Sequence, residues 1–277
     1  MQTVYLNGEY LPLDAARVSV LDRGFTFGDG VYEVLLVYKR KIFRLEEHLR
    51  RLDNSLAAIY MDNPLTRDAW CQVMHRLIED NPADNQSLYL QVTRGISARD
   101  HAIHLAHKPT VFAMSNPVPQ RNFTSGIAAI TCEDIRWKLC NIKAITLLPS
   151  ILLRHKASQA GATEAILLKN GVVTEGAASN VFVVTGDRIK TPPKDSGLLP
   201  GITRDLIIEL LQQEGIGYEE SGITEKELKT ADEIWITSST WEIVPVIKLD
   251  NKPVGNGQPG KIWQQVMDVY SRFKNSI

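Results

Sequence analysis

A short segment with two prolines separates two halves of this chain, and each half carries its own strand and helix patterns. Residues 115–122 read Ser-Asn-Pro-Val-Pro-Gln-Arg-Asn. Two prolines within three residues favour an extended connection and interrupt helices and central strands. With 277 residues, the chain is long enough to bury more than one core. We therefore predict a first domain over 1–116, a linker over 117–122 and a second domain over 123–277.

Strands dominate the pattern of the first half, with two helices set among them. Residues 3–13 predict a hairpin, because Asn7-Gly8 is a pair that suits a tight turn between strands. Leucines recur at three- and four-residue steps over 45–56 and predict a helix, and a second helix is expected over 66–80. The other elements expected in this half are a glycine-bearing loop at 22–30 and strands at 31–38, 87–94 and 109–115.

The second half mixes strands and helices in the same way. A C-terminal helix is predicted to begin at Pro259, since proline suits a first helical position. Another helix, over 145–159, carries four apolar side chains on one side: Leu147, Leu148, Ile151 and Leu152. Strands are expected at 127–131, 164–168, 172–173, 180–184, 233–237 and 243–248. Runs of strands with helices between them fit an α+β (mixed α/β) fold better than a doubly wound parallel sheet.

The charge balance argues against a nucleic-acid partner or an anionic membrane. The formal net charge is −1 and the sequence pI is near 6.6, so no global field attracts polyanions. No apolar run approaches the length of a membrane span, and the N-terminus lacks the pattern of a signal peptide. Three cysteines without metal spacing read as reduced thiols, Cys132 and Cys140 as packing residues. We expect a soluble, cytoplasmic protein.

Three histidines raise the question of a metal site. His101, His104 and His107 recur at every third position. The residues between them read as packing residues, and no carboxylate cluster accompanies them. We therefore predict no metal.

Lys143 and Glu175 are candidates for a specific cofactor chemistry. Lys143 ends the segment Asn-Ile-Lys before a long apolar run, and Glu175 lies in Val-Val-Thr-Glu-Gly-Ala. A lysine amine can form a Schiff base with an aldehyde cofactor, and a buried carboxylate can keep a pyridine nitrogen protonated. These are the two protein groups that pyridoxal 5′-phosphate (PLP) chemistry most requires. On spacing alone the pair is weak evidence, because the chain has many lysines and glutamates.

Other polar segments could bind anionic groups. The loop 196–203 leads into a helix, whose first N–H groups could hold a phosphate, although a turn capped by Thr203 explains it as well. Residues 237–240 offer four hydroxyls, which also suit a polar strand end. Arg99 and His101 stand two positions apart and would point to one side of an extended segment. That arrangement suits a carboxylate, although a solvated loop is the simpler interpretation.

Ten short blocks, spread over nearly the whole chain, occur here in a characteristic order. They are DRGF at 22–25, FGDGVYEV at 27–34, EHLRRL at 47–52, QVTRG at 91–95, EDIRW at 133–137, NIK at 141–143, VTEG at 173–176, SNVF at 179–182, GITR at 201–204 and EIVPV at 242–246. In these blocks the chain resembles the class IV (fold-type IV) PLP-dependent aminotransferases, and among them the D-amino acid group. The resemblance implies a two-domain fold with the cofactor at the domain interface and the Schiff-base lysine in the second domain. It also implies a homodimer whose second subunit completes the active site.

The resemblance further implies a role for each site residue. Lys143 would be the Schiff-base lysine and proton shuttle, and Glu175 would pair with the pyridine nitrogen. The other cofactor contacts would come from Arg51 on the phosphate, helped by Ile202, Thr203 and Ser239, and from Leu199 against the ring. The substrate α-carboxylate would be bound by Tyr32, Arg99 and His101, the last two reaching across from the other subunit.

The expected reaction is transamination of D-amino acids, such as D-alanine, with 2-oxoglutarate to give 2-oxo acids. Two segments depart from the family pattern. Residues 144–146 follow the lysine where a serine-containing stretch is common, and 198–201 look more like the branched-chain enzymes. The alternatives are therefore a branched-chain L-amino acid aminotransferase and a 4-amino-4-deoxychorismate lyase that releases pyruvate. A non-catalytic PLP carrier is disfavoured by the intact Lys143 and Glu175.

Overall fold

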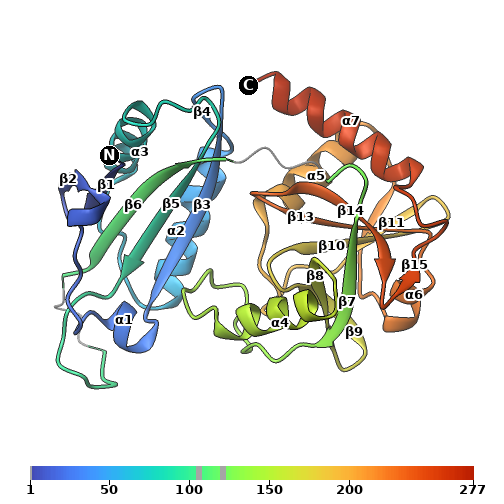
Figure 1. Cartoon of the computed structure of the whole chain (residues 1–277), viewed down its shortest axis with the longest axis horizontal. Helices are drawn as coiled ribbons and strands as arrows, with labels where there is room; N and C mark the ends of the chain where they lie inside the picture. Colours follow the sequence, from blue (N-terminus) through green and yellow to red (C-terminus); the bar gives the residue numbers. More distant parts are fainter. Residues whose placement is uncertain (1, 104–107, 119–122) are drawn as a thin grey trace. The chain divides into compact units, whose positions relative to one another are not determined.

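The chain forms two compact units, each built around its own sheet (Figure 1). The computed structural model describes residues 2–103, 108–118 and 123–277, so His104, His107 and most of the predicted linker lie outside the described residues. The first unit comprises Met1–Pro119 with Ile142–Thr146, and the second Gln120–Asn141 with Leu147–Ile277. Both units contain helices as well as strands, which confirms the predicted mixed α/β class.

The first unit contains a six-stranded antiparallel sheet in the order β2-β1-β6-β5-β3-β4. Its strands are β1 (Thr3–Leu6), β2 (Glu9–Pro12), β3 (Gly30–Tyr38), β4 (Lys41–Ile42), β5 (Gln86–Thr93) and β6 (Thr110–Pro117). The predicted hairpin is confirmed, since Asn7 and Gly8 form its turn with positive φ angles of 53° and 103°. Strand β3 pairs with β5 from Gly30 to Val37 and lies next to the short edge strand β4.

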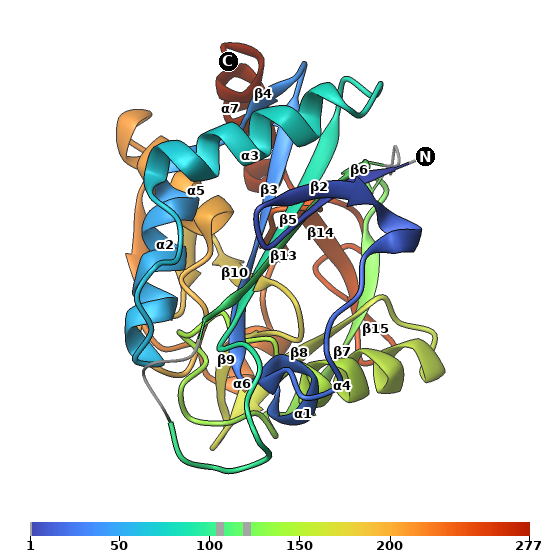
Figure 2. The ribbon, with the colours of Figure 1, turned by 90° about the vertical axis from the view of Figure 1, so that its left-hand side faces the viewer.

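Two helices bury one face of this sheet, α2 (Leu45–Ala58) and α3 (Arg67–Glu79) (Figure 2). The leucines that predicted α2 are the ones it buries, with Leu52 and Leu56 almost fully covered. From α3, Trp70 and Met74 reach the same core. The predicted loop at 22–30 contains a short helix instead, α1 (Arg23–Phe27). Asp22 caps it by accepting a hydrogen bond from Gly24 N at 2.7 Å.

The second unit contains a nine-stranded mixed sheet in the order β12-β11-β10-β13-β14-β7-β8-β9, with β15 also paired to β14. Strand β7 runs parallel to both of its neighbours, β14 and β8, and β11 runs parallel to β12. The strands are β7 (Ile127–Glu133), β8 (Glu164–Lys169), β9 (Val172–Gly176), β10 (Asn180–Thr185), β11 (Arg188–Thr191), β12 (Tyr218–Glu220), β13 (Glu233–Ser238), β14 (Glu242–Leu249) and β15 (Lys252–Pro253).

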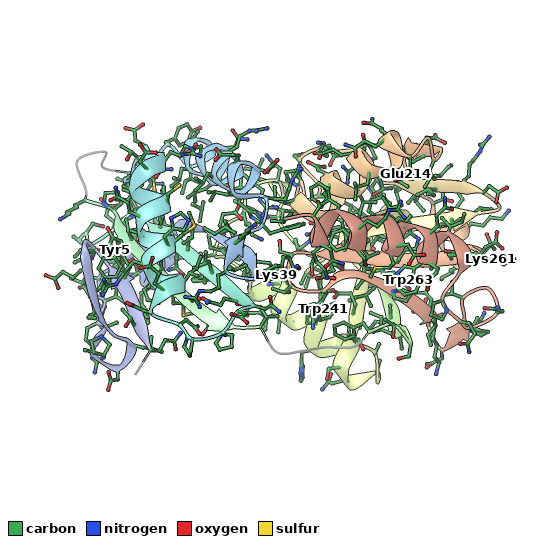
Figure 3. The ribbon with its side chains drawn as sticks, turned by 90° about the horizontal axis from the view of Figure 1, so that it is seen from above. Tyr5, Lys39, Glu214, Trp241, Lys261 and Trp263 are labelled. Atoms are coloured by element: carbon green, nitrogen blue, oxygen red, sulfur yellow. The ribbon has the colours of Figure 1, made fainter. Side chains whose placement is uncertain are left out.

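The helices of the second unit are α4 (Leu148–Gln159), α5 (Ile202–Gln213), α6 (Glu225–Lys229) and α7 (Lys261–Asn275). Helix α7 starts at Lys261, so the prediction that Pro259 opens this helix is wrong. The Glu233 carboxylate fixes the start, because it accepts hydrogen bonds from Ile262 N and Trp263 N at 2.9 and 2.8 Å. Figure 3 shows Trp263 on α7; its indole donates to Ile243 O on β14 at 3.4 Å.

The predicted helix over 145–159 is present as α4, but its apolar side faces solvent. Leu148, Ile151 and Leu152 are 65%, 59% and 52% exposed. The residues that α4 buries are Leu153 and Ala157, which pack against β7 and β8. On a helical wheel these two lie away from the exposed three, so α4 is apolar on both sides.

Lys143 belongs to the first unit, whereas the sequence assigned it to the second domain. The chain returns for residues 142–146, where Ala144 pairs with Val31 at the start of β3. Tyr32 N donates to Lys143 O at 3.0 Å, and Ile142 is buried in the core under α2 and α3. Backbone pairing and burial of Ile142 therefore hold the lysine to the first sheet, a tertiary effect without a local sequence signal. In the part of the chain that the structure describes, none of the helices combines the length and apolar character needed to cross a bilayer.

Candidate active site

Lys143 is partly buried and lies against an aromatic side chain of β3. Its Nζ stands 4.3 Å from the centre of the Tyr32 ring, a cation–π distance. Its backbone N–H donates to Ser55 Oγ on α2 at 3.2 Å. The backbone contacts and the Tyr32 ring therefore fix the direction in which the Lys143 side chain points. Two of the predicted site residues, Lys143 and Tyr32, are thus brought together.

Arg51 of α2 lies in a buried charged cluster beneath the same strand. Its Nε and Nη2 donate to the two oxygens of Glu33 at 2.7 and 2.8 Å, and His48 Nδ1 is 2.8 Å from Glu33 Oε2. Burial alone would raise the pKa of Glu33, but the charge and hydrogen bonds of Arg51 outweigh it and hold that pKa well below its ordinary value. Burial lowers the pKa of His48, so a neutral imidazole donates its Nδ1–H to the carboxylate.

We expect Glu33→Gln to lower the free energy of unfolding by about 3–5 kcal/mol at pH 7, because it leaves a buried guanidinium without its counter-charge. Urea denaturation measures this. Since the folded pKa of Glu33 is depressed, its stabilisation is present above pH 4.5 and is lost as the pH falls towards the folded value. Glu46→Gln is the control: it removes the exposed partner of Arg67 and should change stability little. An equally small effect for Glu33→Gln would contradict the expectation.

Arg99 and His101, both exposed, meet at the ring of Phe27. The Arg99 guanidinium carbon is 5.4 Å from the ring centre, and the His101 ring centroid is also 5.4 Å away. The side chains of Arg99 and His101 therefore share one side of their segment, as their spacing suggested. The loop is exposed to solvent, which agrees with the simpler interpretation of a solvated loop. Binding of a carboxylate by Arg99 and His101 therefore stays a prediction.

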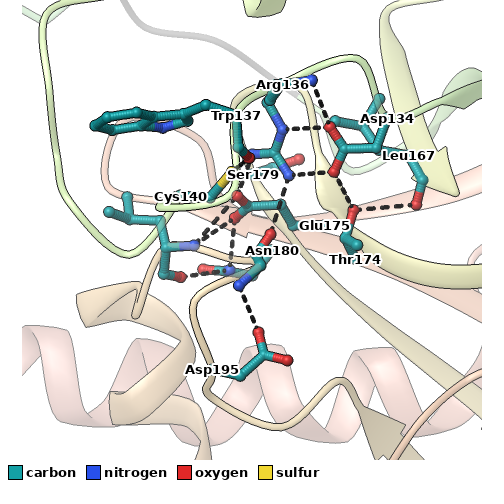
Figure 4. Close-up of polar contacts among 12 residues, drawn as sticks. Asp134, Arg136, Trp137, Cys140, Leu167, Thr174, Glu175, Ser179, Asn180 and Asp195 are labelled. Carbon is teal, nitrogen blue, oxygen red and sulfur yellow. Dashed lines mark hydrogen bonds and ion pairs between the residues drawn. The ribbon is translucent and has the colours of Figure 1, made fainter. Parts of the chain in front are cut away.

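Glu175 lies at the end of β9 in the second unit, 4% exposed, within a network of polar contacts (Figure 4). Arg136 forms an ion pair with its Oε1, and Asn180 Nδ2 donates to its Oε2 at 3.2 Å. Leu199 N donates to both oxygens at 3.2 and 3.1 Å. Asp134 accepts from the other nitrogens of the same arginine, Nε at 2.9 Å and Nη2 at 2.7 Å. These contacts fix both the position and the orientation of the carboxylate.

Burial raises the pKa of Glu175 to about 7, although the Arg136 charge and hydrogen bond act in the opposite direction. Asp134 differs, since the hydrogen bonds and charge of Arg136 overcome burial and lower its pKa. The arginine is therefore shared between one firmly ionised carboxylate and one that ionises near neutral pH. A buried acid with a perturbed pKa, held in a fixed direction, is typical of a catalytic site.

The loop before α5 has the features of a phosphate site. Gly201 is the N-terminal cap of α5, and it offers no side-chain cap for the N–H groups of Ile202 and Thr203. Thr237 Oγ1, on the neighbouring strand β13, is buried without a hydrogen-bond partner within the described residues. Thr237 pairs with Asn180, whose Nδ2 also donates to Leu199 O at 2.9 Å, and Ser239 lies two residues further along. The predicted residues Glu175, Leu199, Ile202, Thr203 and Ser239 thus share one region of the second unit, and uncapped amides with an unpaired hydroxyl suit an anionic group.

Several residues of these clusters were not among the predicted site residues, Glu33 and Arg136 among them. Glu33 meets Arg51 across 18 positions of sequence, from strand to helix, which local patterns do not reveal. Arg136 could have been identified from the sequence, because Asp134, two positions earlier, offers a carboxylate for an ion pair. Among the described residues, no group of histidine, cysteine and acidic side chains could hold a metal; His104 and His107 lie outside them.

Comparisons with known proteins agree with this chemistry. The family model described as amino-transferase class IV matches residues 30–249. The chain is 39% identical to the D-alanine aminotransferase of Bacillus licheniformis over 276 residues, 99% of this chain and 96% of that protein. The crystal structure of the branched-chain amino acid aminotransferase of Escherichia coli has a TM-score of 0.92 at 26% identity, covering 97% of this chain and 93% of that one. The PLP-bound form of a hypothetical aminotransferase from Mycobacterium tuberculosis shares the fold, with a TM-score of 0.85 at 24% identity and 97% of each chain covered. With its family model spanning most of the sequence, this chain belongs to the class IV aminotransferases.

Proposed function

We propose that this enzyme is a PLP-dependent aminotransferase of D-amino acids, with D-alanine and 2-oxoglutarate as a substrate pair. The observation that carries the proposal is the buried Glu175, held between Arg136, Asn180 and Leu199 with a raised pKa. Sequence identity of 39% to a D-alanine aminotransferase over nearly the whole chain supports the choice of substrate.

The resemblance to the class IV aminotransferases implies which residues would hold the cofactor. Lys143 would be its covalent attachment point, with Arg51 and the amides of Ile202 and Thr203 binding its phosphate, helped by Ser239. Leu199 would lie against the ring, and Glu175 would accept the hydrogen bond of the pyridine nitrogen. When bound, PLP supplies an aldehyde that condenses with amines and a ring that withdraws electrons from the substrate α-carbon. The uncapped amides of α5 and the unpaired Thr237 hydroxyl fit its phosphate.

Each protein group then has a defined task. Lys143 Nζ removes the proton from the substrate α-carbon, carries it as an ammonium proton and then returns it to carbon, a general acid–base step. The Glu175 carboxylate opposes the positive charge of a protonated ring nitrogen, and its fixed orientation requires no reorganisation during the reaction. Tyr32 packs beside the lysine and restricts the directions its amine can take.

Substrate orientation would come from Tyr32, Arg99 and His101 binding the α-carboxylate. A guanidinium offers a forked contact to a carboxylate, which fixes orientation as well as charge. The test is a paired assay of D- and L-enantiomers with 2-oxoglutarate and added PLP. We expect D-alanine to be converted and L-alanine not; the reverse preference would overturn the proposal.

A branched-chain L-amino acid aminotransferase is the second candidate, because the Escherichia coli branched-chain enzyme superposes with a TM-score of 0.92. Residues 198–201, Leu-Leu-Pro-Gly, also look more like that group. L-leucine in the paired assay decides between the two. The three free cysteines of the chain suit a reducing compartment, and we include a cytoplasmic location in the proposal.

The proposal includes a homodimer, supported by apolar side chains that each unit exposes. In the second unit they lie on α4, at Leu148, Ile151 and Leu152. In the first unit they flank the loop of Arg99 and His101, at Val18, Val20, Leu21, Phe25, Ile96 and Ile103. Exposed apolar groups gathered in this way are typical of surfaces that bind another protein. A second copy covering them would bring its Arg99 and His101 to the active site of the first.

We expect Ile151→Asp to shift the protein from dimer to monomer and to reduce activity at least tenfold, because it places a charge in an apolar interface. Analytical ultracentrifugation and the transamination assay measure the two effects. Gln265→Asp, on the exposed side of α7, is the matched control and should leave both unchanged. A variant that stays dimeric with full activity would remove α4 from the interface.

A further inference from the structure

Arg23, a buried arginine of α1, contacts the loop that carries Arg99 and His101. Its side chain is 6% exposed. Its Nη1 donates to Asp100 O at 2.6 Å and lies 3.4 Å from Ala102 O, while its backbone N–H donates to Gly95 O at 2.8 Å. One side chain therefore holds the backbone at Asp100, the residue between Arg99 and His101.

The other end of Arg23 is fixed by a second buried pair. Its Nε donates to Asp29 Oδ2 at 2.8 Å, and Arg94 donates to both oxygens of Asp29 at 2.8 and 3.0 Å. Arg94 also donates to Ile59 O, just past the end of α2, at 2.7 Å. Burial alone would raise the pKa of Asp29, but the two arginines outweigh it and lower that pKa. An ionised carboxylate thus links the loop to the body of the unit.

Phe27 completes the arrangement. Arg23 lies over its ring at 4.8 Å, and Arg99 and His101 contact the same ring at 5.4 Å each. The loop itself is exposed over 98–103, so its own packing does little to fix it. Arg23 and Phe27 therefore contribute contacts from outside the loop that place Arg99 and His101.

We propose that Arg23 is a positioning residue for substrate recognition, which sets the spacing of Arg99 and His101 through the Asp100 carbonyl. The inference rests on the proposed function, because it matters only if these two side chains bind the substrate α-carboxylate. A shift of the carbonyl by about 1 Å would misalign a forked contact and weaken binding. Arg23 itself does not touch the substrate.

The test compares Arg23→Gln with the wild type on D-alanine and on D-alaninamide, which lacks the carboxylate charge. We expect KM for D-alanine and for 2-oxoglutarate to rise roughly tenfold, kcat to change less than about threefold, and the rate with D-alaninamide to stay the same. An equal loss with both substrates would overturn the inference, because it would indicate damage to the fold or the cofactor site. An unchanged KM for D-alanine would overturn it too.

A double-mutant cycle with Arg99→Ala sharpens the result. If Arg23 acts through Arg99, its replacement should cost little once Arg99 is absent, whereas independent roles would give additive losses. Arg40→Gln is the matched control, since Arg40 donates from Nη1 and Nη2 to backbone carbonyls of Asn81 and Ile78, and it should leave KM unchanged.

Thermal unfolding is measured for each variant. Should Arg23→Gln fail to fold, Arg23→Lys keeps a charge beside Asp29 but cannot span both Asp29 and Asp100 O, and the same rise in KM is expected. Failure of the proposed function would look different, because the wild type would then convert no D-alanine at all.

Discussion

Lys143→Ala should lower the rate of transamination by roughly four orders of magnitude, since under the proposed function it removes both the attachment point of the cofactor and the group that moves the α-proton. The variant should also fail to develop visible absorbance when PLP is added. Borohydride reduction of the wild type followed by peptide mapping should find the pyridoxyl group on residue 143. The steady-state rate, the absorption spectrum and the modified peptide are the three measurements.

Lys138→Ala is the control for this experiment, because Lys138 is an exposed lysine five residues earlier in the same segment. It should retain activity and absorbance. Near-wild-type turnover by Lys143→Ala, or a label on another lysine, would falsify the assignment of Lys143. The local fold should survive the substitution, since the contacts that hold 142–146 to β3 involve the backbone and Ile142.

Glu175→Gln should lower the rate by roughly 10²- to 10³-fold while PLP remains bound. An amide has nearly the same shape as the carboxylate but cannot oppose the charge of a protonated pyridine nitrogen. The expected phosphate contacts at Ile202 and Thr203 do not involve Glu175, so cofactor affinity should fall much less than the rate. Equilibrium dialysis of PLP and single-turnover kinetics separate the two effects.

The pH dependence provides an independent check on Glu175. Burial raises its pKa to about 7, so the carboxylate becomes more ionised as the pH rises through neutrality. In the cofactor-free protein a raised pKa means that the folded state loses stability as the pH rises from 4.5 to about 7. Glu175→Gln should remove that loss, which urea denaturation of the cofactor-free protein across this pH range measures. A dependence of stability on pH unchanged by the substitution would assign the titration to another group.

Most helices and strands could be predicted from local patterns, because the period of apolar residues reports which face is buried. Helix α2 is the clear case, where the leucine spacing and the buried side coincide. Helix α4 shows the limit of the method, since its apolar spacing marks a side that the single chain leaves exposed. Helix α6 was not predicted, although Thr224 and Glu227 form a capping box at its start. Its five residues are too few to show a repeating pattern of apolar side chains.

The candidate site was predictable in part, and the difference lies in how its residues are brought together. Glu175 and the α5 loop belong to blocks that carry the family resemblance, which identifies them from the sequence alone. The pairing of Glu33 with Arg51 depends on how α2 packs on β3, which residue spacing does not encode. The return of Lys143 to the first unit likewise depends on long-range backbone pairing.

That return has a consequence for how the chain is made. Residues 1–119 alone do not complete the first unit. Its core also contains Ile142, and Ala144 pairs with Val31 of its sheet. Both residues follow Gln120–Asn141, a segment that belongs to the second unit. During synthesis a ribosome must therefore extend the chain past residue 146 before the N-terminal half can close. The enzyme cannot be divided into two separately expressed modules at the proline segment without taking Lys143 away from the sheet that holds it.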